Sequence, residues 1–295
     1  MNNLTLKQLR YFEALSRHRH FGRAAEVCAI SQPALSVQIK ALEDGLGTPL
    51  FERGPREVRL TAFGEDWAVR VRDILRAVDE LGDMARAAQA GLSGRLRIGV
   101  IPTIAPYLLP GLIGHLAKTY PELDLHLRET VTPNLIAELT GGQIDAAIVA
   151  LPVAEPGLEE VPLFDEALVL VRPQSQADHP VPTPERLREM RLLLLEEGHC
   201  FRDQALSFCS FGAGGRKEGL DGSSLSTLVQ MVGAGIGVTL IPEMAVGVET
   251  RSAPVSVARF RNPEPHRTVG MIWRKTNPLA SQFGLVADAV RQVTA

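Results

Sequence analysis

Short apolar runs alternate with helical stretches from residue 94 onward, and this alternation limits the possible folds more than any other feature. A strand followed by a helix and another strand is typical of α/β proteins, in which helices cover a sheet. Strands are expected at 95–100, 123–129, 144–150, 167–171, 191–196, 237–241, 255–260 and 268–273. Helices are expected at 104–118, 133–140, 200–209, 223–233 and 278–293. The pattern predicts an α/β domain of two lobes, each built on a sheet, with ligand sites at the carboxyl ends of strands.

The N-terminal part of the chain has the pattern of a helix-turn-helix. A helical apolar stripe at 9–15 precedes FGRAAEVCAI and SQPALSVQIKALED, which predict two helices joined by a tight turn near Ala29–Ile30. Ser31 is expected to cap the third helix, because its hydroxyl can accept an otherwise unpaired backbone N–H. Pro33 fits the first helical turn, where no N–H is needed. Apolar residues at i, i+4 and i+7 of this helix should face a core: Leu35, Ile39 and Leu42.

Two further elements follow the helix-turn-helix. PLFERG and REVRL predict a two-stranded wing that turns at Gly54–Pro55. After Thr61, which can cap a helix, apolar residues spaced alternately four and three apart predict a long helix with a coiled-coil seam: Trp67, Val71, Ile74, Val78, Leu81, Ala85 and Ala88. The seam favours dimerisation, and the alternative is a long helix packed on its own domain. The joint GLSGR ends this helix, so we expect a winged head at 1–61, a linker helix at 62–91 and a two-lobed domain at 92–295.

The charge distribution and one face of the third helix indicate DNA binding. The net charge is −3, but residues 1–61 carry +3 and the remainder carries −6, as in a basic head on an acidic body. The face opposite the expected core carries the candidate DNA contacts Pro33, Ser36, Val37 and Lys40, Gln32 lies at the start of the helix, and Arg53 and Arg56 lie on the wing. Gln32 and Ser36 can hydrogen-bond base edges, and Lys40 suits phosphate. The alternative is a set of solvated residues on a protein-interaction domain.

The cysteine count and the N-terminus predict where the protein resides. Three cysteines form an odd, low number, which argues against a secreted disulfide framework and for a reducing compartment. The N-terminus MNNLTLKQLR lacks the charged-then-apolar pattern of a signal peptide, which argues against export. Apolar runs such as RLLLLE are too short to span a bilayer. We therefore expect a cytoplasmic protein without a membrane partner.

The segment GHCFRDQALSFC, residues 198–209, holds two of the three cysteines. Cys200 follows an expected strand and opens an expected helix, where the helix dipole and free N–H groups stabilise a thiolate. His199 and Arg202 can add hydrogen bonds or positive charge, and Asp203 can help to hold a peroxide and protonate its leaving oxygen. Such a thiolate would become a sulfenic acid, which Cys209 could convert into a disulfide.

Two alternatives stay open for these cysteines on the residues alone. They could be buried and inert, as we expect of Cys28 on the alanine-rich second helix. They could also bind zinc, although four ligands are needed and this spacing is unusual for a zinc site. If 200–209 is one helix, a rise of ~1.5 Å per residue separates the cysteines by roughly 13 Å. A disulfide needs Cα atoms closer than about 7 Å, so the bond requires the helix to unwind.

The head and the domain order resemble a known family. HFGRAAEVCAISQPALSVQIKALEDGLGTPLFER resembles the winged head of LysR-type transcriptional regulators, and the long helix and two-lobed domain complete that family's order over the whole chain. The resemblance implies a periplasmic-binding-protein-like regulatory domain that senses a signal and is not an enzyme. It also implies a homodimer or a dimer of dimers on a partly palindromic site. We expect no cofactor.

A narrower resemblance concerns the cysteine segment. LLLLEEGHCFRDQALSFC resembles the sensing segment of the hydrogen-peroxide sensors in this family, as do IGVIPTIAPYLLP, ETVTPN and PEPHRTVGMIW. The resemblance implies that Cys200 reacts with peroxide and that Cys209 resolves the product. It implies a surrounding set of Thr103, Thr132, His199, Asp203 and Arg267. The stretch SFGAGGRKEGLDG is richer in glycine than that resemblance predicts.

Together these features predict a regulator that senses hydrogen peroxide through a reversible Cys200–Cys209 disulfide. Oxidation would alter its contact with promoter DNA and RNA polymerase at antioxidant genes, and thioredoxin or glutaredoxin systems would reduce it. One rival is a LysR-type regulator that binds a small metabolite between its lobes. A second rival is a thiol peroxidase with an unusual N-terminal domain.

Overall fold

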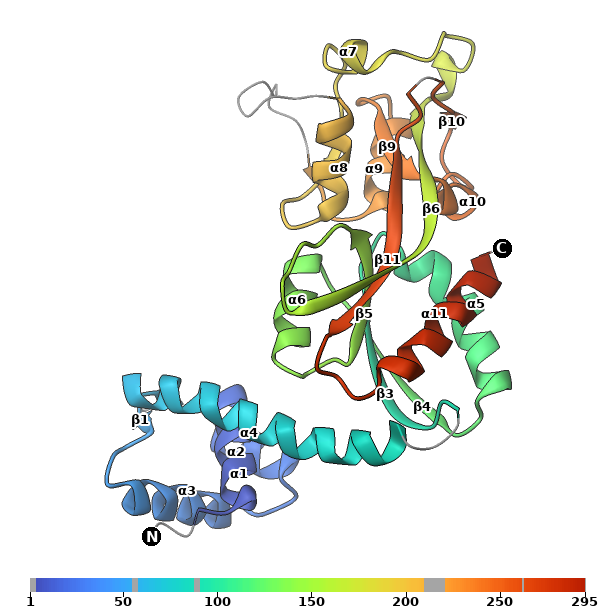
Figure 1. Ribbon diagram of the computed structural model, residues 1–295. Coiled ribbons are helices and arrows are strands. Elements are labelled where there is room, and N and C mark those ends of the chain that lie inside the picture. The colour runs from blue at the N-terminus through green and yellow to red at the C-terminus, as the bar shows by residue number, and fades with distance from the viewer. Residues whose placement is uncertain (1–3, 55–57, 88–90, 210–220, 262, 295) are drawn as a thin grey trace. The chain divides into compact units, whose positions relative to one another are not determined.

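The computed structural model describes residues 4–54, 58–87, 91–209, 221–261 and 263–294 (Figure 1). The chain forms two compact units, Met1–Ala85 and Arg86–Ala295. The first unit contains the head and most of the long helix. The predicted division into head, linker helix and two-lobed domain stays a prediction. None of the helices in the described ranges is both long and apolar enough to cross a bilayer.

The first unit is a helix-turn-helix followed by a wing, as the sequence predicts. Its elements are α1 (Leu6–His18), α2 (Phe21–Val27), α3 (Gln32–Leu46) and the antiparallel pair β1 (Phe51–Arg53) and β2 (Val58–Leu60). Ser31 caps α3 by accepting a hydrogen bond from the Ala34 N–H at 3.3 Å. Ala29 makes the tight turn before it with a φ of 52°. The three predicted core residues of α3 are buried, and Cys28 packs partly buried against the same core.

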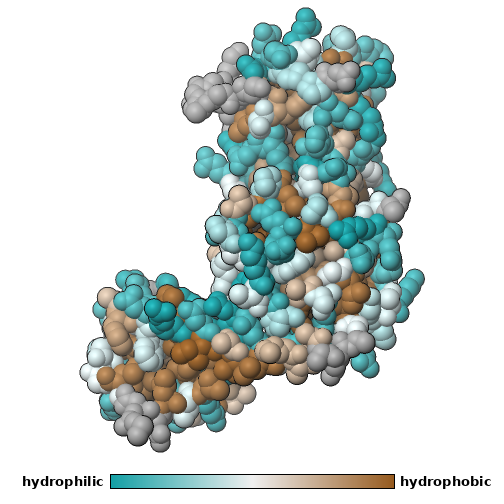
Figure 2. Space-filling model, viewed as in Figure 1, coloured by the Kyte–Doolittle hydropathy of each residue, from teal (hydrophilic) through white to brown (hydrophobic). Residues whose placement is uncertain are grey.

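The long helix α4 (Ala62–Ala87) begins after Thr61, whose hydroxyl accepts a hydrogen bond from the Gly64 N–H at 2.9 Å. Val71 packs in the core of the first unit, whereas Ile74 and Leu81 of the same seam are 43% and 65% exposed. Figure 2 shows hydrophobic side chains gathered along one side of this unit. Part of the seam is thus open to solvent in the single chain, and dimerisation through it stays a prediction.

The second unit has two lobes that share a long strand. In the first lobe, β3 (Gly94–Val100) lies between β4 (Leu123–Glu129) and β5 (Ala146–Leu151) and is parallel to both. Beside β5, β11 (His266–Arg274) runs antiparallel and continues the sheet to β6 (Leu158–Pro173). The helices of this lobe are α5 (Ala105–Thr119), α6 (Thr132–Thr140) and α11 (Ala280–Thr294). The α/β prediction is confirmed, and these helices begin and end within two residues of their expected positions.

The second lobe is built on the far half of β6. That half pairs antiparallel with β9 (Thr239–Pro242) and β10 (Val255–Ala258). A short parallel pair, β7 (Leu194–Leu195) and β8 (Asp221–Gly222), lies beside α8 (Cys200–Phe208) and α9 (Leu225–Gly233). Smaller elements complete the lobe: η1 (Gln174–Gln176), α7 (Pro184–Leu187), η2 (Glu243–Ala245) and α10 (Val246–Glu249).

Two of the predicted strands are wrong in length. The run 191–196 forms a strand only at Leu194–Leu195, and the run 167–171 is the end of a strand that begins at Leu158. The first half of β6 has no continuous apolar pattern, because Pro162 and acidic residues such as Glu159 and Glu160 interrupt it. Backbone pairing with β11 forms it instead. This extension carries β6 from one lobe into the other (Figure 1).

Candidate functional site

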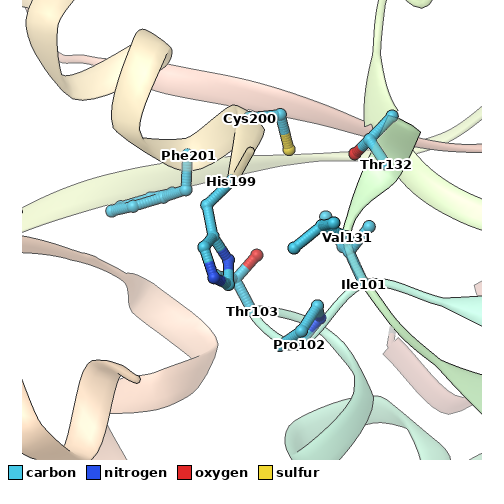
Figure 3. A pocket seen from close by; sticks show the side chains of 8 residues that line it. All are labelled: Ile101, Pro102, Thr103, Val131, Thr132, His199, Cys200 and Phe201. Carbon is cyan, nitrogen blue, oxygen red and sulfur yellow. The ribbon is translucent and has the colours of Figure 1, made fainter. Parts of the chain in front are cut away.

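Two adjacent parallel strands bring two threonines to one pocket. Thr103 lies in the turn between β3 and α5, and Thr132 is the first residue of α6, shortly after β4. Because β3 and β4 are parallel neighbours, their carboxyl ends meet at the same edge of the sheet. Both threonines line a small pocket together with His199 and Cys200 of the second lobe (Figure 3). Four of the predicted site residues therefore converge.

Cys200 opens α8, as the sequence predicts. The chain leaves β7 and turns at Gly198, whose φ of 93° is a conformation that glycine adopts without steric cost. His199 is the N-cap of α8 and supplies no side-chain hydrogen bond to the helix. The His199 side chain therefore does not cap the positive end of the helix dipole, and the neighbouring Cys200 thiol can interact with it.

The pocket around Cys200 is tight and contains a buried hydroxyl group. Thr132 Oγ1 is buried and makes no hydrogen bond to any residue that the structure describes. Figure 3 shows the Cys200 sulfur pointing into the pocket and the Thr132 oxygen pointing toward the side of the pocket on which that sulfur lies. An unpaired buried hydroxyl costs free energy, so this arrangement favours a small polar ligand between the two atoms. The remaining space is smaller than a water molecule, so such a ligand must displace side chains slightly.

A buried arginine next to the pocket holds Thr103 by two hydrogen bonds. Arg267 Nη1 donates to Thr103 Oγ1 at 2.8 Å, and Arg267 Nη2 donates to the Thr103 carbonyl at 3.0 Å. The guanidinium carbon lies 5.6 Å from the centre of the Phe201 ring, next to Cys200 in α8. Arg267 is also paired with the buried Glu166 at 2.7 Å. Glu166, 101 residues from Arg267, was not predicted from the sequence. The one pattern that could have indicated it is an acidic residue directly before the apolar run ALVLV.

The neighbours of Cys200 in sequence have different positions. Burial lowers the pKa of His199, which favours the neutral imidazole, and Glu196 partly opposes this. Arg202 Nη1 donates to the Leu195 carbonyl at 2.7 Å and to Asp221 Oδ2 at 3.0 Å, which ties α8 to β7 and β8. Asp203 is exposed in the first turn of α8. Neither Arg202 nor Asp203 is among the described residues that line the pocket, and their predicted roles toward peroxide stay predictions.

Cys209 lies at the opposite end of α8 from Cys200. Its side chain is fully buried in the core of the second lobe, whereas Cys200 packs against the core of the first lobe. Burial raises the pKa of the Cys209 thiol to about 11, and Arg188 opposes this in part. The predicted single helix over 200–209 is confirmed to within one residue. The two thiols are therefore separated by the length of an intact helix, roughly 13 Å at ~1.5 Å per residue.

The predicted DNA-binding residues of α3 lie on its outer face. Gln32, Pro33, Val37 and Lys40 are exposed, and Ser36 is half-buried. Arg53 is the last residue of β1, and Arg56 lies outside the described residues. The contact roles of all these residues stay predictions.

A larger cavity of about 360 Å³ adjoins the thiol pocket, and His199 lines both. Tyr107 donates to Glu249 Oε1 at 2.6 Å and Ser226 donates to Glu249 Oε2 at 2.5 Å, which links α5 of the first lobe to the second. Burial raises the pKa of Tyr107, and the hydrogen bond to Glu249 raises it further. Among the residues that the structure describes, no three His, Cys, Asp or Glu side chains converge as a metal site would require.

Comparison with known proteins identifies the family. Residues 6–65 match the family described as "Bacterial regulatory helix-turn-helix protein, lysR family", and residues 89–295 match the "LysR substrate binding domain". The chain belongs to the LysR family of transcriptional regulators. Both the resemblance and the fold class predicted from the sequence are thereby confirmed.

Relatives place this regulator in the OxyR group of the family. It is 44% identical to a "Probable hydrogen peroxide-inducible genes activator" of Streptomyces viridosporus, over 98% of this chain and 94% of that protein. It is 42% identical to the "DNA-binding transcriptional dual regulator OxyR" of Escherichia coli K12, over 98% of this chain and 95% of that protein. A hydrogen peroxide-bound structure of a Corynebacterium glutamicum OxyR mutant matches with 35% identity and a TM-score of 0.68, over 98% of this chain and 92% of that chain.

Proposed function

We propose that this regulator senses hydrogen peroxide through a reversible disulfide between Cys200 and Cys209. One observation carries the proposal: the Thr132 hydroxyl, which has no hydrogen-bond partner among the described residues, lines the same pocket as Cys200 at the N-terminus of α8. A peroxide molecule is small, and its two oxygens can each donate and accept a hydrogen bond. It would supply the missing partner of Thr132 while placing an oxygen against the sulfur.

The proposed chemistry has two steps. The Cys200 thiolate attacks one peroxide oxygen, the S–O bond forms, the O–O bond breaks, and the departing hydroxide takes up a proton and becomes water. Cys200 is then a sulfenic acid. The Cys209 thiolate attacks the Cys200 sulfur, the S–S bond forms, the S–O bond breaks, and the departing hydroxide takes up the proton that the Cys209 thiol has lost and leaves as a second water. Peroxide is reduced to two waters, and the two thiols are oxidised.

The second step requires a conformational change. Cα atoms joined by a disulfide lie within about 7 Å of each other, which is about half the separation along an intact α8. Cys209 must also leave the core of the second lobe to reach Cys200. Oxidation therefore unwinds α8 and empties a core position, which gives the signal a structural consequence.

The consequence is proposed to be a change in DNA binding. The regulator would act as a homodimer, or a dimer of dimers, in the cytoplasm, on a partly palindromic promoter site at antioxidant genes. Its contact with RNA polymerase would differ between the two redox states, and thioredoxin or glutaredoxin systems would restore the thiols. Each chain is oxidised once for each signal, as a regulator requires, and does not turn over peroxide as an enzyme.

The test is a count of thiols in the full chain after one equivalent of peroxide. We expect free thiols to fall from three to one per chain, with Cys28 left free and a peptide pair joined through Cys200 and Cys209 found by mass mapping. Addition of thioredoxin and its reductase should restore all three. An unchanged thiol count would contradict the proposal. It would favour the second candidate, a small metabolite in the cavity of about 360 Å³ that adjoins the thiol pocket.

DNA binding by the α3 face gives a separate prediction. Lys40→Ala should weaken binding to the promoter about three- to tenfold near 0.1 M salt, and should lower the slope of log K against log salt by about one, because one phosphate contact is lost. Lys118→Ala is the matched control, since Lys118 is an exposed lysine of the second unit. Titration of a labelled promoter fragment at several salt concentrations measures both. Equal slopes for wild type and Lys40→Ala would contradict the assignment of this face.

A further inference from the structure

A buried ion pair lies where the two lobes meet. Arg267 of β11 and Glu166 of β6 are direct partners in the antiparallel register. Two residues further along β6, Leu168 pairs with Pro242 of β9, which belongs to the second lobe. The pair therefore sits at the point where β6 leaves one sheet for the other.

Both oxygens of the Glu166 carboxylate are engaged. Oε2 accepts from Arg267 Nε at 2.8 Å and from Nη2 at 2.7 Å, and Oε1 accepts from the Met244 N–H at 2.9 Å. The side chain is 5% exposed, and that of Arg267 is fully buried. A carboxylate held on both oxygens in the interior has one orientation, and the planar guanidinium paired with it shares that constraint.

The fixed guanidinium contacts both halves of the thiol pocket. Toward the first lobe it donates to the Thr103 hydroxyl and carbonyl, and toward the second lobe it lies over Phe201, the residue after Cys200. Because Thr103 Oγ1 accepts from Arg267, its own proton points elsewhere and can be donated into the cavities that Thr103 lines, one of which is the thiol pocket. Thr103 is thereby set as a donor toward a bound peroxide.

We propose that Glu166 is a positioning residue for the reaction of Cys200 with peroxide. It acts through Arg267: it orients the guanidinium, and the guanidinium in turn fixes the Thr103 hydroxyl and the first turn of α8 about the bound peroxide. This inference rests on the proposed function. It adds a residue that touches neither peroxide nor thiol and yet determines how fast they react.

The experiment measures the second-order rate constant for loss of the Cys200 thiol by rapid mixing of the full-length protein with hydrogen peroxide. In Glu166→Gln the amide nitrogen must face either the Met244 N–H or the guanidinium, so one of the two contacts is lost. We expect a rate about ten- to a hundredfold lower, because displacements of about 1 Å have effects of this size. Glu166→Asp keeps the negative charge but places it farther from Arg267, because its side chain is one methylene shorter. We expect an intermediate rate from this second variant.

The control variant is Glu160→Gln. Glu160 lies on the same strand and its carboxylate accepts from the backbone N–H groups of Val153 and Ala154, so the loss of charge is matched at a site remote from the thiol. We expect its rate to stay within about twofold of wild type. Alkylation of Cys200 by iodoacetamide, which needs no donor from Thr103, should change far less in Glu166→Gln than the peroxide rate does.

A double-mutant cycle with Arg267→Gln separates positioning from general stabilisation. If Glu166 acts through Arg267, the double variant is no slower than Arg267→Gln alone. Multiplicative effects in the double variant, or wild-type rates in both Glu166 variants, would overturn the inference while leaving the proposed function intact. A failure of wild type to lose its two thiols would instead refute the proposed function.

Discussion

Cys200→Ser should abolish the fast reaction with peroxide and with it the change in promoter binding. Serine is nearly isosteric but its hydroxyl does not attack a peroxide O–O bond, so all three chemical consequences disappear: the sulfenic acid, the disulfide and the unwinding of α8. Rapid mixing with peroxide followed by thiol counting measures the first two. Footprinting on the promoter before and after peroxide measures the change in promoter binding that we expect the unwinding to cause. We expect the variant to keep the footprint of the reduced form at every peroxide concentration.

Two further cysteine variants serve as controls for that result. Cys209→Ser should still lose the Cys200 thiol at the wild-type rate but stop at the sulfenic acid, which dimedone would trap. Cys28→Ser should behave as wild type, because Cys28 packs against the core of the first unit. A Cys200→Ser protein that still forms a peroxide-dependent disulfide would contradict the assignment of the reactive thiol.

Cys209 in the reduced, folded chain should resist alkylation. With a pKa of about 11, only about one thiol in a thousand is ionised at pH 8, whereas an ordinary cysteine with a pKa of about 8.5 is roughly a quarter ionised. Ionisation alone therefore slows iodoacetamide by about two orders of magnitude relative to the urea-denatured chain, and complete burial slows it further. Raising the pH from 8 toward 11 should increase the rate steadily, because the thiol ionises over that range.

Peptide mass analysis of a time course reads the labelling of Cys200 and Cys209 separately, and the denatured chain supplies the reference rate. The same measurement on Cys209 in Cys200→Ser shows whether the core position stays closed when no oxidation occurs. Rapid native labelling of Cys209 would mean that α8 already opens in the reduced state. The disulfide would then not require peroxide to unwind the helix, and the proposed switch would lose its physical basis.

The sequence by itself determined the local structure, namely where helices begin and which segments form strands or helices. Ser31 caps α3, and Cys200 opens α8, because capping and helix initiation depend on a few neighbouring residues. The strand and helix alternation fixed the α/β class for the same reason, since each run carries its own periodicity. The apolar pattern did not predict the first half of β6, because pairing with β11 forms that part of the strand.

The family resemblance named several residues around the thiol, but only the tertiary structure decided how they are arranged and what holds them. It placed Arg267 against Glu166, 101 residues away, and behind Thr103, 164 residues away. It turned Arg202 toward Asp221 and left Asp203 in solvent, although both stand within three residues of Cys200. The physical reason is that a helix turns its side chains by about 100° at each residue, so neighbours in sequence face different surroundings. Contacts across lobes depend on strand order and register, which no local pattern of residues encodes.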